Sequence, residues 1–306
     1  MTTEEATPAT PSSRPALEKP ATPVTEFVLT LDCAESPGII HAVSEFLLAH
    51  GCNIIDIKQF GDRQEQHFFM RVHFVSAGAD ADVEDLRQDF LPVAAEWDMT
   101  WRLERHGRKQ RILVMVSKYG HCLNDLLFRA RIGELPVEIV AVVSNHQDHE
   151  DLVTWHGIPF HHVPVSQQTK PAAEATLLSL VDSYQVELVV LARYMQVLSD
   201  NLTARLAGRA INIHHSFLPS FKGAKPYHQA YERGVKTVGA TAHYVNSELD
   251  EGPIIAQQVI EVDHTYTPAD LVAVGRDAEC KALTNAVRWH AEGRIILSGN
   301  RTVILR

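Results

Sequence analysis

The stretch ELVVLARYMQVLSDNLTARLAGRAINIHH, from Glu187 to His215, indicates the fold of most of this chain. Its two ends, ELVVLA and RAINIHH, are short and largely apolar, as strands buried on both faces of a parallel sheet usually are. Similar runs occur upstream as ILVMVS (112–117), VEIVAVVS (137–144) and GIPFHHVPV (157–165). These runs predict the strands of one buried sheet.

Helical patterns separate these strands, among them CLNDLLFRAR (122–131) and AEATLLSLVDSYQ (173–185). Alternation of strands and helices predicts an α/β domain with a doubly wound, mostly parallel sheet over residues 111–306. Ligands of such sheets bind at the carboxyl ends of the strands. The side chains directly after ELVVLA and RAIN are therefore candidate site residues.

A smaller α+β domain is predicted over residues 25–105. The predicted strands are EFVLTLDC (26–33), NIIDIKQFGD (53–62), QHFFMRVHFV (66–75) and MTWRLER (99–105), and the predicted helices are IIHAVSEFLLAHG (39–51) and VEDLRQDFLPVAAEWD (83–98). The order is βαββαβ. Because proline removes a helical hydrogen bond, Pro92 is expected to interrupt the second helix.

Two segments lie outside these domains. Residues 106–110 are expected to form a basic linker, and residues 1–24, rich in Thr, Pro and Ala, a flexible tail. The tail has no apolar core of the kind that a secretory signal needs.

The composition narrows the classes of partner. A formal net charge of -10 argues against a nucleic acid or an anionic membrane as the partner. The four cysteines show no CxxC spacing, so no disulfide framework or zinc knuckle is predicted, and a reducing cytoplasm is expected. No apolar run approaches the roughly 20 residues that span a bilayer.

Two extended motifs resemble those of the folate-dependent formyltransferases. The first is NIHHSFLPSFKG within residues 211–234, and the second is the strand and acidic loop GATAHYVNSELDEGPIIAQQVI (239–260). The resemblance covers residues 110–265. It implies that Asn212, His214 and Asp250 are the catalytic set.

The spacing is consistent with that assignment. Asn212 and His214 lie two residues apart on one strand, so their side chains share a face. The Asn212 amide is expected to donate to the oxyanion formed on the attacked formyl carbon. His214 is expected to donate to the same oxygen or to pass a proton to the departing nitrogen, while Asp250 orients water and helps remove its proton.

The resemblance also implies where the folate binds. The pterin is expected beside Met195, Gln196, Val197 and Leu198 and against the loop Val245, Asn246, Ser247 and Glu248. Arg193, Lys222 and Lys225 could meet the glutamate tail. The alternative for residues 195–198 is that they form the end of a strand and pack in the core of the protein itself.

The N-terminal block resembles the ACT domain, with ESPGII (35–40) as the turn from strand to helix. Such domains usually pair with a copy from another subunit and bind a small ligand at the shared edge. The resemblance implies a homo-oligomer, a dimer or a tetramer, and an amino-acid effector. The alternative is that this domain only dimerises.

The loop SKYGHC (117–122) bears on the acceptor of the formyl group. Glycinamide ribonucleotide transformylases hold their substrate phosphate with a loop of small residues there, whereas bulky residues here would hinder a nucleotide-sized acceptor. Lys118 and Gly120 are accessory candidates, since Lys118 could still meet an anion. His215 is a third, because it could position water or support its loop.

Together with the ACT-like block, these motifs resemble the deformylase branch of the family. That branch hydrolyses 10-formyltetrahydrofolate to formate and tetrahydrofolate, which balances one-carbon pools and supplies formate for purine synthesis. The alternatives are formyl transfer to an amine and a non-catalytic amino-acid or folate sensor. No cofactor is expected, and a metal-free mechanism is preferred, because HExxH is absent and HEDLVTWH (149–156) has the wrong spacing for two ligands on one helix face.

Overall fold

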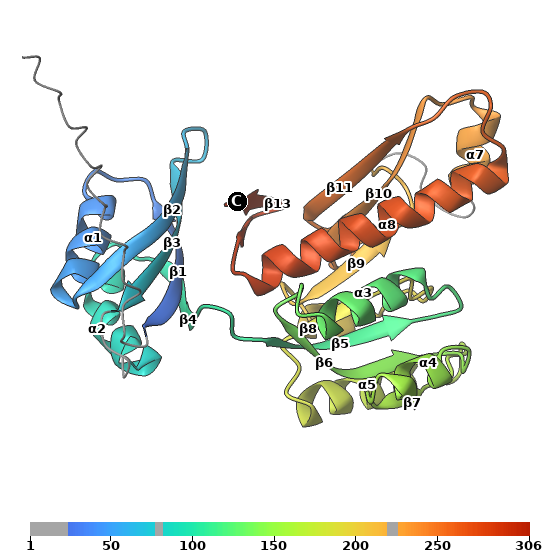
Figure 1. The fold of residues 1–306 in the computed structure, drawn as a ribbon, viewed down its shortest axis with the longest axis horizontal. Helices are drawn as coiled ribbons and strands as arrows, with labels where there is room; N and C mark the ends of the chain where they lie inside the picture. Colours follow the sequence, from blue (N-terminus) through green and yellow to red (C-terminus); the bar gives the residue numbers. More distant parts are fainter. Residues whose placement is uncertain (1–23, 77–81, 219–225) are drawn as a thin grey trace, which may run out of the picture.

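The computed structural model describes residues 24–76, 82–218 and 226–306, and it contains two domains joined by an extended segment (Figure 1). All but the last residue of the predicted tail lies outside the described residues. Lys222 and Lys225 lie outside them as well. No helix in the described ranges is long and apolar enough to cross a membrane.

The N-terminal domain has the predicted βαββαβ order. Its elements are β1 (Thr25–Ala34), α1 (Ile39–Ala49), β2 (Cys52–Asp62), β3 (His67–Ser76), α2 (Val83–Glu96) and β4 (Thr100–Arg105). The antiparallel sheet has the strand order β2-β3-β1-β4, and both helices cover one of its faces. Phe27, Phe74 and Phe90 are fully buried in the core between these layers.

Helix α2 runs through Pro92, so the expected interruption is wrong. Proline removes one backbone hydrogen bond and crowds the carbonyl four residues before it. Pro92 lies on the exposed side of the helix, where water can satisfy the freed carbonyl. On the opposite side of the helix, Leu86, Phe90 and Ala94 are buried in the domain core. This packing stabilises the helix.

The larger domain is built on a seven-stranded sheet with the order β11-β10-β9-β8-β5-β6-β7. Its elements are β5 (Gln110–Val116), α3 (His121–Arg131), β6 (Val137–Ser144), α4 (Glu150–Trp155), β7 (Phe160–His162), α5 (Lys170–Ser183), β8 (Leu188–Leu191), α6 (Asp200–Arg205), β9 (Ala210–His214), α7 (Pro226–Glu232), β10 (Thr237–Tyr244), β11 (Ile254–Glu261) and α8 (Pro268–Ala291). Strands β5 to β9 are parallel, and β10 runs antiparallel to both of its neighbours. The doubly wound, mostly parallel sheet is therefore confirmed.

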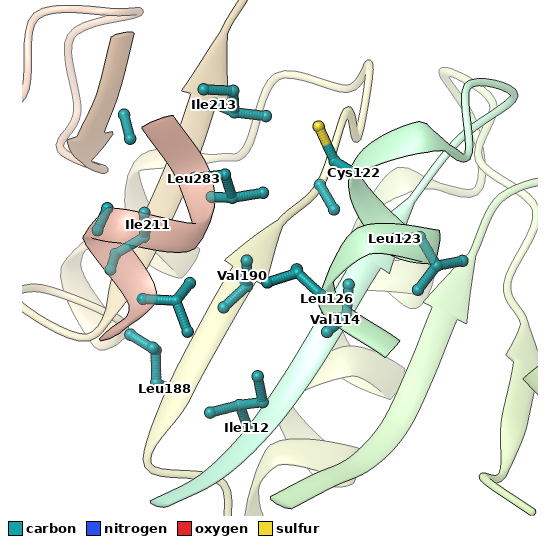
Figure 2. Packing of buried hydrophobic residues seen from close by; sticks show 14 of the residues in the cluster. Ile112, Val114, Cys122, Leu123, Leu126, Leu188, Val190, Ile211, Ile213 and Leu283 are labelled. Carbon is teal, nitrogen blue, oxygen red and sulfur yellow. The ribbon is translucent and has the colours of Figure 1, made fainter. Parts of the chain in front are cut away.

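Both faces of this sheet are covered, which explains the continuous apolar runs. Alternate residues of β5 point to opposite sides: Ile112 and Val114 pack with α3 and α8, and Leu113 and Met115 pack with α5. Figure 2 shows the first of these cores, where Leu126 of α3 meets the strand residues. The strand order reverses between β5 and β8, and the carboxyl ends there leave a crevice for a ligand.

The end of the chain contacts the N-terminal domain. The hairpin β12 (Ile295–Ser298) and β13 (Arg301–Ile304) follows α8, and Ile296 and Leu305 pack on Phe69 of β3. The guanidinium of Arg71 donates two hydrogen bonds to the carbonyl of Glu292, at 3.1 and 3.3 Å. Thr30 donates to the neighbouring carbonyl of Gly293. The C-terminal end of α8 is thus fixed against the N-terminal sheet.

Candidate active site

A cavity of about 670 Å³ opens at the carboxyl ends of β5, β8 and β9. This is the reversal point of the strand order, as the sequence predicts for the ligand site. The residues that line it in the described ranges come from the loops after β5, β8 and β10, from the ends of β8, β9 and β10, and from α3, α6, α7 and α8. Its volume suits a drug-sized ligand.

Asn212, His214 and Asp250 all line this cavity and contact one another. Nδ1 of His214 lies 3.1 Å from Oδ2 of Asp250. Nδ2 of Asn212 lies 3.5 Å from Oδ1 of the same carboxylate. Two residues of β9 and one residue of the loop after β10 therefore meet, and each carboxylate oxygen faces a different member of the set.

The backbone of the Asp250 loop is shaped for this contact. Asp250 has φ 59°, a left-handed conformation that Asp adopts more readily than most residues. Two residues later the chain returns so close to β10 that a Cβ on Gly252 would lie 1.7 Å from the carbonyl oxygen of Tyr244. Only glycine fits this approach, and it turns the loop back toward Asn212 and His214.

The two ring nitrogens of His214 have different surroundings. Nδ1 donates to the Asp250 carboxylate, which fixes the tautomer and the ring orientation. Nε2 is buried and has no hydrogen-bond partner in the part of the chain that the structure describes. Because His214 lines the cavity, Nε2 is the nitrogen left for a substrate or a water molecule.

Asp250 is held in its charged form. Burial raises the pKa of its carboxyl, but the contacts with His214 and His243 outweigh burial and hold that pKa well below its ordinary value. A carboxylate with so low a pKa is a weak proton acceptor near neutral pH.

His243 belongs to this group of residues and was missed in the sequence. Its Nδ1 donates to the carbonyl of Tyr244 at 2.8 Å, and its Nε2 lies 3.3 Å from Nδ2 of Asn212. Nε2 also lies 3.7 Å from Oδ1 of Asp250. His243 lies opposite Asn212 in the pairing of β9 with β10, a register that no local sequence pattern gives.

His215 lines the cavity beside His214, with ring centroids 5.1 Å apart. Burial is the main cause that lowers the pKa of His215 to about 4, and the charge of Arg193 adds to it. A neutral imidazole therefore lies next to the catalytic set near neutral pH.

This neutral histidine predicts a pH dependence of stability, and His290 adds to it. Burial is the first cause that lowers the pKa of His290 to about 4, and its Nδ1 lies 2.6 Å from the Tyr244 hydroxyl. An unfolded histidine titrates near pH 6.5, so between about pH 6.5 and 4 the unfolded chain binds protons that the folded chain does not. As pH falls from about 6.5 to 4, the free energy of unfolding should decrease by roughly 1 kcal/mol per pH unit for each histidine.

Urea unfolding at a series of pH values checks this expectation. His290→Gln should reduce the slope between pH 6.5 and 4.5, while the exposed His41→Gln should leave it unchanged. The lowered pKa of Asp250 acts in a different window, since its contribution is lost only as pH falls below about 3.8. Equal slopes for His290→Gln and the parent would contradict the expectation.

All eight residues predicted to bind the pterin line the same cavity. They are Met195, Gln196, Val197, Leu198, Val245, Asn246, Ser247 and Glu248. The side chains of Met195 and Val197 are 51% and 57% exposed, so they are not packed in the core of the protein. The hydroxyl of Ser117, at the end of β5, accepts from the Met195 backbone N–H at 3.0 Å and positions this segment.

Three other candidates have surroundings that differ from the expected ones. Lys118 is exposed and does not line the cavity in the described ranges. Gly120 is explained by packing, since a Cβ there would lie 2.5 Å from the His149 ring. Arg193 lines the cavity but is buried beside Glu279, with Nε 3.3 Å from Oε2, so it is not available to a solvent-exposed glutamate tail.

Family models match both domains. The formyl transferase model matches residues 110–287, and the ACT domain model matches residues 26–104. The ACT-like block and the formyltransferase-type block of the sequence are thereby confirmed.

Individual proteins match over most of the chain. A formyltetrahydrofolate deformylase of Corynebacterium sp. (strain P-1) is 64% identical over 279 residues, which are 91% of this chain and 98% of that protein. The crystal structure of a formyltetrahydrofolate deformylase from Burkholderia mallei is 50% identical, with a TM-score of 0.88, and the match covers 92% of this chain and 100% of that one. Glycinamide ribonucleotide transformylase 1 from Symbiobacterium toebii is 33% identical, with a TM-score of 0.62, over 67% of this chain and 98% of its own. The chain therefore belongs to the formyltetrahydrofolate deformylase family, in which an ACT domain precedes a formyl transferase domain.

Proposed function

We propose that this protein is a hydrolase that converts 10-formyltetrahydrofolate and water to formate and tetrahydrofolate. The observation that carries the proposal is the mutual contact of Asn212, His214 and Asp250 inside a cavity that the eight pterin-side residues also line. Relatives named formyltetrahydrofolate deformylase support the substrate.

Asn212 stabilises the charge that forms on the formyl oxygen. Attack on the formyl carbon converts its C=O into an oxyanion, and a preorganised amide N–H donor lowers the energy of that state. The Nδ2 contacts of Asn212 with His243 and Asp250, at 3.3 and 3.5 Å, are long enough to yield to a stronger acceptor. They also hold the amide in place before substrate arrives.

His214 handles the proton. With its Nδ1 proton directed at Asp250, its Nε2 lone pair can take a proton from the attacking water. The oxygen–carbon bond forms, the bond between the formyl carbon and N10 breaks, and N10 receives the proton from His214. Formate and tetrahydrofolate result, and His214 returns to its starting tautomer.

Asp250 acts through His214 in this scheme. Its lowered pKa makes it a weaker base than the free imidazole nitrogen, so we assign it the orientation of His214 and the stabilisation of the imidazolium. This differs from the sequence-based expectation that Asp250 orients the water and helps remove its proton.

We propose that the reaction needs no metal ion. Two groups of described residues place metal-type donor atoms near one another, namely Glu26, His73 and His106, and His121, Cys122 and Glu279. In the second group, which adjoins the cavity, the hydrogen bond with Cys280 and burial raise the pKa of the Cys122 thiol well above its ordinary value. A protonated thiol beside an Arg193–Glu279 pair disfavours a cation, so activity should survive treatment with a chelator.

We further propose that the N-terminal domain joins two copies of the chain and binds a small amino acid at their junction. The edge strand β2 exposes Ile55, Ile57 and Phe60, and an exposed apolar edge strand favours pairing with a second sheet. Ile57→Lys should therefore lower the mass measured by sedimentation equilibrium, whereas an unchanged mass would place the contact elsewhere.

One assay tests the proposed reaction and separates it from the two alternatives. The protein is incubated with 10-formyltetrahydrofolate and no amine, and formate and tetrahydrofolate are followed. Equimolar release of both is expected. Turnover that appears only when an amine is added would identify a transferase, and binding without turnover would identify a sensor.

A further inference from the structure

Five side chains form a second polar cluster in the cavity, which we call the acceptor-side cluster. They are Tyr119, His121, Arg193, Tyr227 and Glu279, and all of them line the cavity. The pterin-side residues come from the loops after β8 and β10. The acceptor-side cluster is built mainly from other elements: the loop between β5 and α3, the first residue of α3, and helices α7 and α8.

Glu279 is the centre of this cluster. Its side chain is only 2% exposed, and both of its oxygens are engaged. Oε1 accepts from the Tyr227 hydroxyl at 3.0 Å, and Oε2 accepts from His121 Nε2 at 2.7 Å. Arg193 adds the opposite charge, with Nε 3.3 Å from Oε2 and its guanidinium carbon 5.5 Å from the centre of the Tyr119 ring.

The geometry of α8 favours this arrangement. Gly275, one turn before Glu279, leaves the space in which the Tyr227 ring lies, since a Cβ there would come within 2.1 Å of that ring. Burial raises the pKa of Glu279, but the hydrogen bond from His121 and the charge of Arg193 outweigh burial and lower it. Burial and Glu279 raise the pKa of Tyr227, so the phenol keeps its proton and keeps donating it. Both oxygens of Glu279 and the Tyr227 hydroxyl are therefore satisfied near neutral pH, whereas Nε and Nη1 of Arg193 are buried without a hydrogen-bond partner in the described residues.

One histidine, His215, lies near both the acceptor-side cluster and the catalytic set. The ring of His215 lies 6.3 Å from that of Tyr227 and 5.1 Å from that of His214. A nucleophile that approaches His214 past these elements meets the rings of Tyr119, His121 and Tyr227 and the Arg193–Glu279 ion pair.

We propose that the acceptor-side cluster fills the space that an amine acceptor would occupy, so that only water reaches the formyl carbon. The inference rests on the proposed hydrolysis. An amine substrate needs room for its whole body beside the formyl carbon, whereas a water molecule needs only about 30 Å³. The transformylase from Symbiobacterium toebii shares the fold of this domain, so a difference in acceptor has to come from the side chains that line the cavity rather than from the fold.

Hydrolysis and formyl transfer to an amine break the same bond and differ only in the nucleophile. In each, the bond from the formyl carbon to N10 breaks and N10 gains a proton. An oxygen–carbon bond forms with water, or a nitrogen–carbon bond forms with a primary amine that loses one proton. The ratio of formylated amine to formate therefore reports which nucleophile reaches the carbon, whatever fraction of the protein is active.

The test opens the cluster from the loop side. The double variant Tyr119→Gly/His121→Ser removes two bulky side chains without touching Asn212, His214 or Asp250. Lys118→Ala is the matched control, because Lys118 lies on the same loop but is exposed and outside the cavity lining. Each protein receives 10-formyltetrahydrofolate with glycinamide ribonucleotide as the amine, and both products are quantified. Equilibrium dialysis with labelled glycinamide ribonucleotide measures acceptor binding independently of turnover.

The parent and Lys118→Ala should give formate with almost no formylated amine and should bind no acceptor. The double variant should raise the ratio of formylated amine to formate by about tenfold or more, as expected when a steric barrier to one substrate is removed. If it loses turnover altogether, acceptor binding in dialysis would support the proposal and absence of binding would overturn it. A double variant that still hydrolyses but neither binds nor formylates the amine would also overturn it. Failure of the parent to release formate would instead refute the proposed hydrolysis.

Discussion

Replacement of Asp250 by Asn is expected to lower kcat by about a thousandfold, because it removes the charge that orients His214 and stabilises its imidazolium. The new side-chain amide has nearly the shape of the carboxylate but can donate to Nδ1 of His214. The proton then sits on Nε2, and the nitrogen that faces the cavity loses the lone pair that takes the proton of water. Steady-state release of formate from 10-formyltetrahydrofolate measures the effect.

The neighbouring acid provides the control for this substitution. Glu251 is exposed and does not line the cavity, so Glu251→Gln should keep kcat within about twofold of the parent. Asp250→Asn activity within about tenfold of the parent would refute the orienting role of the carboxylate.

Replacement of Asn212 by Ala is expected to lower kcat by about a hundred- to a thousandfold with little change in KM. The amide contacts the formyl oxygen most strongly when that oxygen carries charge, so its loss raises the energy of the transition state more than that of bound substrate. The pterin is held by other residues, those of the loops after β8 and β10. Full steady-state kinetics separate the two constants.

The double variant Asn212→Ala/Asp250→Asn tests whether the two residues act together. Residues that act as a unit lose their effect together, so the double variant should be much more active than the product of the two single losses predicts. Fully multiplicative losses would indicate that Asn212 and Asp250 act independently. A large rise in KM with unchanged kcat for Asn212→Ala would assign the amide to substrate binding instead.

Much of the site was predictable because it follows from strand order. Asn212 and His214 alternate on one apolar run, and the sheet places the ends of ELVVLA and RAIN at one edge. The motif containing Asp250 is long and local, so it could be read without a structure. The pterin-side residues lie in the segments that directly follow predicted strands, and all of them line the cavity.

The remaining site residues depend on contacts that no local pattern encodes. His121 and Glu279 lie 158 residues apart, and they meet only because α3 and α8 pack on the same face of the sheet. His243 joins Asn212 through a register that is defined by the pairing of β9 with β10. Arg193 directly follows β8, and it was a candidate for binding the glutamate tail of the folate. Its burial against Glu279 could not be read from the sequence.

The differences in the fold have similar causes. The effect of Pro92 depends on which side of α2 faces water, and that is decided by the packing of Phe90 and Ala94. The contact between Arg71 and Glu292 joins residues 221 positions apart and ties the end of α8 to the N-terminal sheet. Both are tertiary effects that override local preferences.

The most direct measurement is a reaction in water enriched in oxygen-18, with 10-formyltetrahydrofolate, a chelator and no amine. Hydrolysis by attack of water on the formyl carbon predicts formate that carries one oxygen atom from the solvent, equimolar tetrahydrofolate, and the loss of both in Asp250→Asn. Formate without solvent oxygen, or no formate until an amine or a metal ion is added, would contradict metal-free attack of water at Asn212, His214 and Asp250.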